Sequence, residues 1–326
     1  MNVEEKNFSK NLTPSTSPKK SSPLAEGFLA FFLITVSLTF FISIALIVDF
    51  GAYSVIFSLL GYLTGLLIVL FFTMHFDGMG LKSSFKYLGI KRKHALRYAG
   101  FGIAFCSVQF YIKTVIESFF GIKPIPLSWI DWLTIFFILF IMILLVGFFE
   151  EITFRGYIQS KLIEANSNKV FRDIPIGLVI ATLLFGLAHI PSLVITTIVE
   201  EGPREVLKTV FLIVLIYQST ILAIVGLTLG MMFYRSNNNL FGNMTWHGTW
   251  NFYVFINPLP VIIAHPTTSL IIVPTLDNTD FALLVVTELL LIPLILLIGY
   301  GLIELMPLPK DEKIQHFNSK ELKVNI

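Results

Sequence analysis

Apolar segments about as long as a lipid bilayer is thick recur along most of this chain. Eight are visible, at 25–48, 53–75, 98–120, 132–149, 174–199, 209–233, 240–263 and 281–305. A helix needs about 20 apolar residues to cross the hydrocarbon core of a membrane, and several segments reach that length. Only 13% of the residues are charged, against about a quarter in soluble domains. The sequence therefore predicts an all-α, polytopic membrane helix bundle with about eight transmembrane helices.

Polar segments flank the predicted bundle at both ends. Residues 1–23 are rich in Ser, Pro, Lys and Asn and lack an apolar period, which indicates a disordered tail. Residues 307–326 form a second polar tail. We therefore expect the bundle at 24–306, and no internal repeat is visible in it.

Lys and Arg residues are distributed unevenly among the predicted connections. The stretches 49–52 and 264–280 contain none, whereas the connection 76–97 contains Lys82, Lys86, Lys91, Arg92, Lys93 and Arg97. Both tails also contain several lysines. Because cytoplasmic loops of membrane proteins carry an excess of Lys and Arg, we expect a multi-pass integral protein of the plasma membrane with both termini in the cytoplasm.

Three short polar motifs interrupt the apolar segments. They are Glu-Glu-x-x-x-Arg at 150–155, Phe-x-x-x-His at 185–189 and His-x-x-x-Asn at 247–251. An ionisable group within a membrane helix costs roughly 2.5–3.5 kcal/mol on insertion scales. Structural pairing could explain one or two such groups, but two acids, an arginine and two histidines together favour a functional site.

The first motif combines a pair of charges with a second acid. On a helix, Glu151 and Arg155 are i,i+4 neighbours and can pair on one face. Glu150 is turned by about 100° from Glu151, so it can face a cavity and act as a general base. The alternative for Glu151 and Arg155 is a pair that only joins helices.

The two histidine motifs are ambiguous when each is taken alone. His189 follows small residues that permit close helix approach, and a lone histidine there could simply be a packing residue. His247 and Asn251 share one helix face, where two donors suit a developing oxyanion, or a metal with a supporting amide. Hydrogen bonding between helices is the alternative for this pair.

The depth of the motifs in the membrane constrains the helices that carry them. If the fourth helix began near 132 on the outer side, Glu150 would lie about 27 Å along it, at 1.5 Å per residue. It would then lie too close to the cytoplasm to meet His189. We therefore expect the fourth helix at roughly 140–164, and a fifth helix that continues past Pro191 to Val199.

The order of the three motifs resembles the CPBP intramembrane proteases, also called the ABI or type II CAAX prenyl endopeptidase family. The resemblance covers about 140–260, where we expect the protease core. It implies an intramembrane glutamic endopeptidase in which Glu150 and His189 activate the attacking water. It further implies that His247 and Asn251 stabilise the oxyanion, while Glu151 and Arg155 support the site.

The same resemblance indicates which substrates and cofactors to expect. We expect a peptide or lipidated-protein substrate within the lipid bilayer, and no nucleic acid. Two histidines and a glutamate could hold zinc, but we expect no obligatory metal or other cofactor. Two alternatives are a proton-coupled membrane transporter and a non-catalytic membrane immunity or scaffold protein.

Overall fold

The structure is a computed structural model that describes part of the chain. The described residues are 22–48, 51–119, 143–166, 170–171 and 174–256, together with residues 133, 136, 137, 140 and 141. The predicted helix at 281–305 and the two polar tails lie outside these ranges, apart from residues 22 and 23.

Long helices dominate the described residues. They are α1 (Pro23–Val48), α2 (Gly51–His75), α4 (Ala95–Phe119), α8 (Ile176–Ala188), α9 (Ile190–Glu201), α10 (Thr209–Arg235) and α11 (Phe241–Ile256). Three described segments are long and apolar enough to cross a membrane, namely Pro23–Ala45, Ile56–His75 and Ile176–Val199. The prediction of an all-α membrane helix bundle is confirmed.

Some small elements were not predicted from the sequence. The basic connection after α2 contains a short helix, α3 (Leu81–Tyr87). Strands β1 (Val170–Phe171) and β2 (Ile174–Pro175) form a short antiparallel pair, and a turn of 3₁₀ helix covers Glu205–Leu207. These elements are too short for apolar periodicity to reveal them.

The polar first motif lies on a helix in the middle of the bundle. This helix, called the central helix below, consists of the π-helical segment Ile143–Gly147, α6 (Phe148–Glu151), a second π-helical segment Ile152–Gln159 and α7 (Ser160–Ala165). Its end at Ala165 agrees with the helix expected at roughly 140–164, while the described residues 133, 136, 137, 140 and 141 are also helical. π-helical turns are rare and occur frequently at functional sites.

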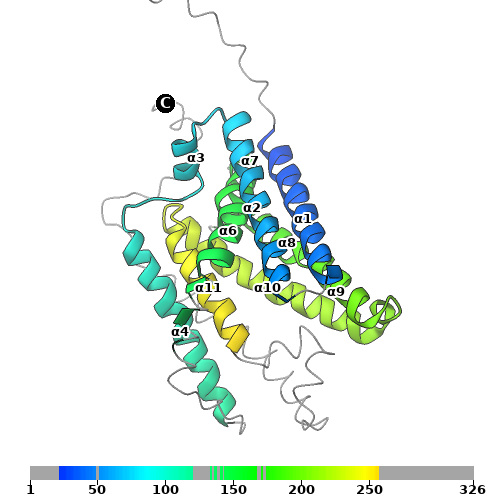
Figure 1. Cartoon of the computed structure of the whole chain (residues 1–326). Coiled ribbons are helices and arrows are strands. Elements are labelled where there is room, and N and C mark those ends of the chain that lie inside the picture. The colour runs from blue at the N-terminus through cyan, green and yellow to red at the C-terminus, as the bar shows by residue number, and fades with distance from the viewer. Residues whose placement is uncertain are drawn as a thin grey trace, which may run out of the picture.

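Helix pairs surround the central helix. Figure 1 shows α1 and α2 on one side of it and α4 and α11 on the other, with α8 and α10 packed across it. The α8–α9 segment continues through His189, whose backbone is helical (φ −87°, ψ −16°), so the expected continuation past Pro191 is confirmed. The motifs at 150–155, 185–189 and 247–251 thus lie on three neighbouring parts of one bundle.

Two glycines allow α11 to approach the central helix closely. A Cβ atom built on Gly147 would lie 2.3 Å from the carbonyl oxygen of Met244, and one built on Gly248 would lie 2.3 Å from Cα of Ile143. No side chain fits at such separations, so the backbones of α11 and the central helix are in direct contact here. This contact sets His247, the neighbour of Gly248, beside the paired glutamates.

A buried ion cluster joins one end of the central helix to α1 and α2. The ammonium group of Lys161 lies 2.6 Å from Oε2 of Glu26 and forms an ion pair with Asp77. The Lys161 side chain is only 3% exposed. Burial raises the pKa of the Asp77 carboxyl above its usual value, against the opposing effect of Lys161. In this buried cluster, the positive charge of Lys161 therefore compensates the carboxyl groups of Glu26 and Asp77.

Candidate active site

Glu151 is the most enclosed charged group of the candidate site. Its carboxyl group is fully buried and contacts Nδ1 of His247 at 2.8 Å and the side-chain amide of Asn243 at 3.2 Å. Nε of Arg155 lies 3.5 Å from the same carboxyl group. The predicted i,i+4 pair between Glu151 and Arg155 is therefore present. These partners come from two helices, so the acid also fixes α11 against the central helix.

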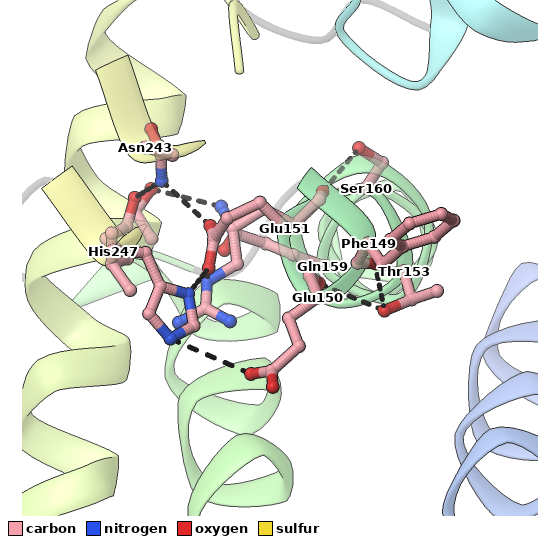
Figure 2. A network of polar contacts seen from close by, with 11 residues as sticks. Phe149, Glu150, Glu151, Thr153, Gln159, Ser160, Asn243 and His247 are labelled. Atoms are coloured by element: carbon pink, nitrogen blue, oxygen red, sulfur yellow. Dashed lines mark hydrogen bonds and ion pairs between the residues drawn. The ribbon is translucent and has the colours of Figure 1, made fainter. Parts of the chain in front are cut away.

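Glu150 and Glu151 approach the same histidine from neighbouring positions. Figure 2 shows both side chains extending from the central helix toward His247, one toward each ring nitrogen. Oε2 of Glu150 lies 3.7 Å from Nε2 of His247, which is beyond a normal hydrogen bond. Oε1 of Glu150 accepts a hydrogen bond of 2.9 Å from the hydroxyl group of Tyr62 on α2.

The hydrogen bonds of the two histidines fix their protonation patterns. An ionised carboxylate only accepts hydrogen bonds, so Nδ1 of His247 donates to Glu151. Nδ1 of His189 lies 2.8 Å from the carbonyl oxygen of Phe185, and a carbonyl also only accepts. In each ring the proton on Nδ1 is therefore donated in this hydrogen bond, and Nε2 can interact with another partner.

The aromatic ring of Phe185 contacts both histidines and the arginine of the site. Its ring centroid lies 4.9 Å from that of His189 and 6.0 Å from that of His247, with both pairs near a T-shaped arrangement. The guanidinium carbon of Arg155 lies 4.0 Å from the centroid of the same ring. A cation over an aromatic face is attracted by the ring quadrupole. His189 also interacts electrostatically with Glu150, His247 and Arg155.

Most of the site residues predicted from the sequence lie together. Glu150, Glu151, Arg155 and His247 are joined by direct contacts, and His189 adjoins them through Phe185. Asn251 lies one helical turn after His247 and is half-buried. Within the described part of the chain, its side chain makes no hydrogen bond to this group.

Two further residues of the network were missed by the sequence analysis. Asn243 precedes His247 by four residues, so its place on the same helix face as His247 and Asn251 could have been noticed. Its amide contacts both Glu151 and, at 2.6 Å, the carbonyl oxygen of Leu229. Tyr62 gave no comparable signal, because a tyrosine in an apolar helix is common and its partner is 88 residues away.

The fit of a metal ion can be judged from the side chains. Among the described residues, no group of three or more His, Cys, Asp or Glu side chains is arranged to hold one. The two histidines direct Nδ1 to Glu151 and to a carbonyl oxygen, respectively. The described arrangement therefore does not match the usual three-ligand zinc site.

These features define an integral membrane helix bundle with a buried cluster of acids, histidines and an arginine. Residues 132–253 match the family model described as type II CAAX prenyl endopeptidase Rce1-like. This match confirms, over that segment, the resemblance to the CPBP (CAAX protease-like) family. All three motifs lie within the matched segment. No curated protein and no solved structure matches the chain.

Proposed function

We propose that this protein is an intramembrane glutamic endopeptidase that hydrolyses peptide bonds of membrane-associated substrates with water activated by Glu150 and His189. The observation that best supports this proposal is the position of Glu150. One oxygen of its carboxyl group is held by Tyr62, while the other faces Nε2 of His247 across 3.7 Å.

The attacking water would be held by two acceptors. Glu150 offers a carboxylate oxygen, and neutral His189 offers Nε2 because its Nδ1 proton is committed to the carbonyl oxygen of Phe185. Glu150 takes one proton from the water as general base, and the resulting hydroxide attacks the carbonyl carbon of the scissile peptide bond. Glu150 then returns that proton to the leaving nitrogen as the carbon–nitrogen bond breaks.

The oxyanion formed by this attack needs hydrogen-bond donors. His247 can donate from Nε2 when it is an imidazolium, while its Nδ1 donates to Glu151. The amide of Asn251, one turn further along α11, is the second donor in this proposal. Loss of one such donor typically costs about 10²–10³ in kcat. Arg155 holds Glu151 in place and contacts no reacting atom.

The proposal extends to substrates and location. The family match supports peptide or prenylated-protein substrates, presented within the lipid bilayer. We place the protein in the plasma membrane with both termini cytoplasmic, on the basis of the distribution of Lys and Arg. We assign the bundle to 24–306 and the catalytic core to about 140–260.

The direct test uses purified protein in proteoliposomes with two matched peptides. One is a farnesylated peptide that ends in a CAAX sequence, and the other is the same peptide without the lipid. We expect cleavage by the wild type, loss of cleavage in Glu150→Gln and in His189→Ala, and normal cleavage in Glu205→Gln. Glu205 is a suitable control because it pairs only with the largely exposed Lys208 in the described contacts.

The outcomes of this test separate the alternatives. Equal cleavage by Glu150→Gln would overturn the proposed mechanism. Failure of the wild type to cleave either peptide would contradict a CAAX-protease-like activity and favour a transporter or a binding protein. Cleavage that stops on chelation and returns with zinc would assign a metal to the reaction.

A further inference from the structure

Tyr62 is a polar residue in the middle of the largely apolar helix α2, and its only hydrogen bond among the described contacts goes to the proposed base. Its hydroxyl group lies 2.9 Å from Oε1 of Glu150. The two residues come from different helices, and neither the three motifs nor the family match at 132–253 includes Tyr62. The contact is therefore an addition to the site described by the motifs.

Packing holds the phenol ring in this position. The ring of Tyr62 stacks on that of Phe149, with centroids 6.2 Å apart and planes 23° from parallel. One turn further along, α2 meets the central helix again, because a Cβ atom on Gly65 would lie 3.4 Å from Cγ2 of Thr153. Tyr62 and Gly65 are three residues apart on α2, and their partners Glu150 and Thr153 are three residues apart on the central helix. The two helices therefore lie side by side in a fixed register.

The carboxyl group of Glu150 has different neighbours on its two oxygens. Oε1 accepts from Tyr62, and Oε2 faces Nε2 of His247. Arg155 and His189 act on Glu150 electrostatically, without a direct hydrogen bond to it. Among these neighbours, Tyr62 is the one that donates a hydrogen bond to Glu150, so it determines which oxygen remains free.

We infer that Tyr62 is a positioning residue, which holds Oε1 of Glu150 so that Oε2 is presented to the attacking water and to His247. Without the phenol donor, the carboxyl group can rotate, and either oxygen can turn away from the histidine. This inference rests on the proposed function, because it assigns the orientation of the general base. A hydrogen bond to a charged group is worth enough to change a rate by about 10- to 100-fold.

The test compares Tyr62→Phe with Tyr111→Phe, which removes the same hydroxyl group from a tyrosine that is 71% exposed. With the farnesylated peptide as substrate, we expect Tyr62→Phe to lower kcat by about 10- to 100-fold while KM changes little. Tyr111→Phe should match the wild type in both respects.

A spectroscopic measurement makes the test independent of turnover. The infrared bands of the Glu150 carboxyl group are isolated by subtracting the spectrum of Glu150→Gln from that of the wild type. We expect these bands to change in Tyr62→Phe and to stay unchanged in Tyr111→Phe. Unchanged bands in a folded Tyr62→Phe protein would overturn the inference.

Failure of the inference is distinguishable from failure of the proposed function. If Tyr62→Phe cleaves like the wild type while Glu150→Gln is inactive, Glu150 is essential but Tyr62 does not position it. If Glu150→Gln retains full activity, the proposed function itself is wrong.

Discussion

Glu151 is fully buried, and each of its contacts has a separate role. His247 and Asn243 hold it from α11, and Arg155 holds it from the central helix. A buried charge without partners would cost several kcal/mol, so these contacts make its ionised form tolerable within the bundle. The hydrogen bond to Nδ1 also fixes the orientation of the His247 ring.

Replacement of Glu151 by Gln tests this dual role. The substitution keeps the shape of the side chain but leaves Arg155 buried without its counter-charge, and breaking a buried ion pair costs about 3–5 kcal/mol. We expect a lower melting temperature and a kcat reduced by at least about 10²-fold. Thermal unfolding in detergent and peptide cleavage measure the two effects, with Glu205→Gln as the control. A melting temperature equal to that of the wild type would show that the contacts of Glu151 contribute little to the stability of the fold.

The pairing of Glu151 with Arg155 was predictable because it depends only on helical spacing. The approach of His247 to both acids was predictable only as an expectation that the polar motifs converge. The contact between Tyr62 and Glu150 was not predictable, because it depends on the rotation of α2 about its own axis. Hydropathy does not fix that rotation in a helix whose sides are all apolar.

At the scale of elements, the site depends on how closely α11 lies against the central helix. Gly147 and Gly248 remove the side chains that would otherwise separate the two backbones. The end of the central helix at Ala165 was predictable, because Glu150 and His189 can meet only if both lie near the middle of the membrane. The π-helical segments on both sides of α6 were not predicted, because apolar periodicity does not reveal single π-helical turns.

Substitution of Gly248 by Ala tests the close contact. The new methyl group would lie 2.3 Å from Cα of Ile143, so the helices must separate and His247 must move with α11. We expect lower stability and a loss of cleavage of about 10²-fold or more, in line with the sensitivity of catalysis to displacements near 1 Å. Gly100→Ala is the matched control, because nothing lies within 4 Å of a Cβ atom there. Normal cleavage by Gly248→Ala would contradict the proposed packing.

The ion cluster around Lys161 gives a second prediction at this scale. In Lys161→Met, Glu26 and Asp77 lose their shared cation in a buried position. We expect a loss of about 3–5 kcal/mol in the free energy of unfolding. Lys208→Met, in which the removed lysine is 59% exposed, should change the free energy by no more than about 1 kcal/mol. Denaturant unfolding in detergent measures both free energies of unfolding. An equal loss in Lys161→Met and Lys208→Met would show that burial does not strengthen the Lys161 cluster.

At the scale of the whole molecule, the sequence was sufficient to predict the class of fold but not all of its parts. Long apolar runs identify membrane helices because the bilayer imposes one length on them. The short helix α3 and the strand pair β1–β2 have no such constraint. Convergence of the motifs required three neighbouring parts of the bundle to pack together, and only the three-dimensional arrangement provides that information.

The central claim is that the polar centre of this bundle hydrolyses peptide bonds through Glu150. The most direct measurement incubates membranes containing the wild type, Glu150→Gln or Glu205→Gln in water enriched in ¹⁸O, and then reads new peptide C-termini by mass spectrometry. The account predicts ¹⁸O-labelled termini that appear with the wild type and with Glu205→Gln but not with Glu150→Gln. The same labelled termini in the presence of Glu150→Gln, or none with the wild type, would contradict it.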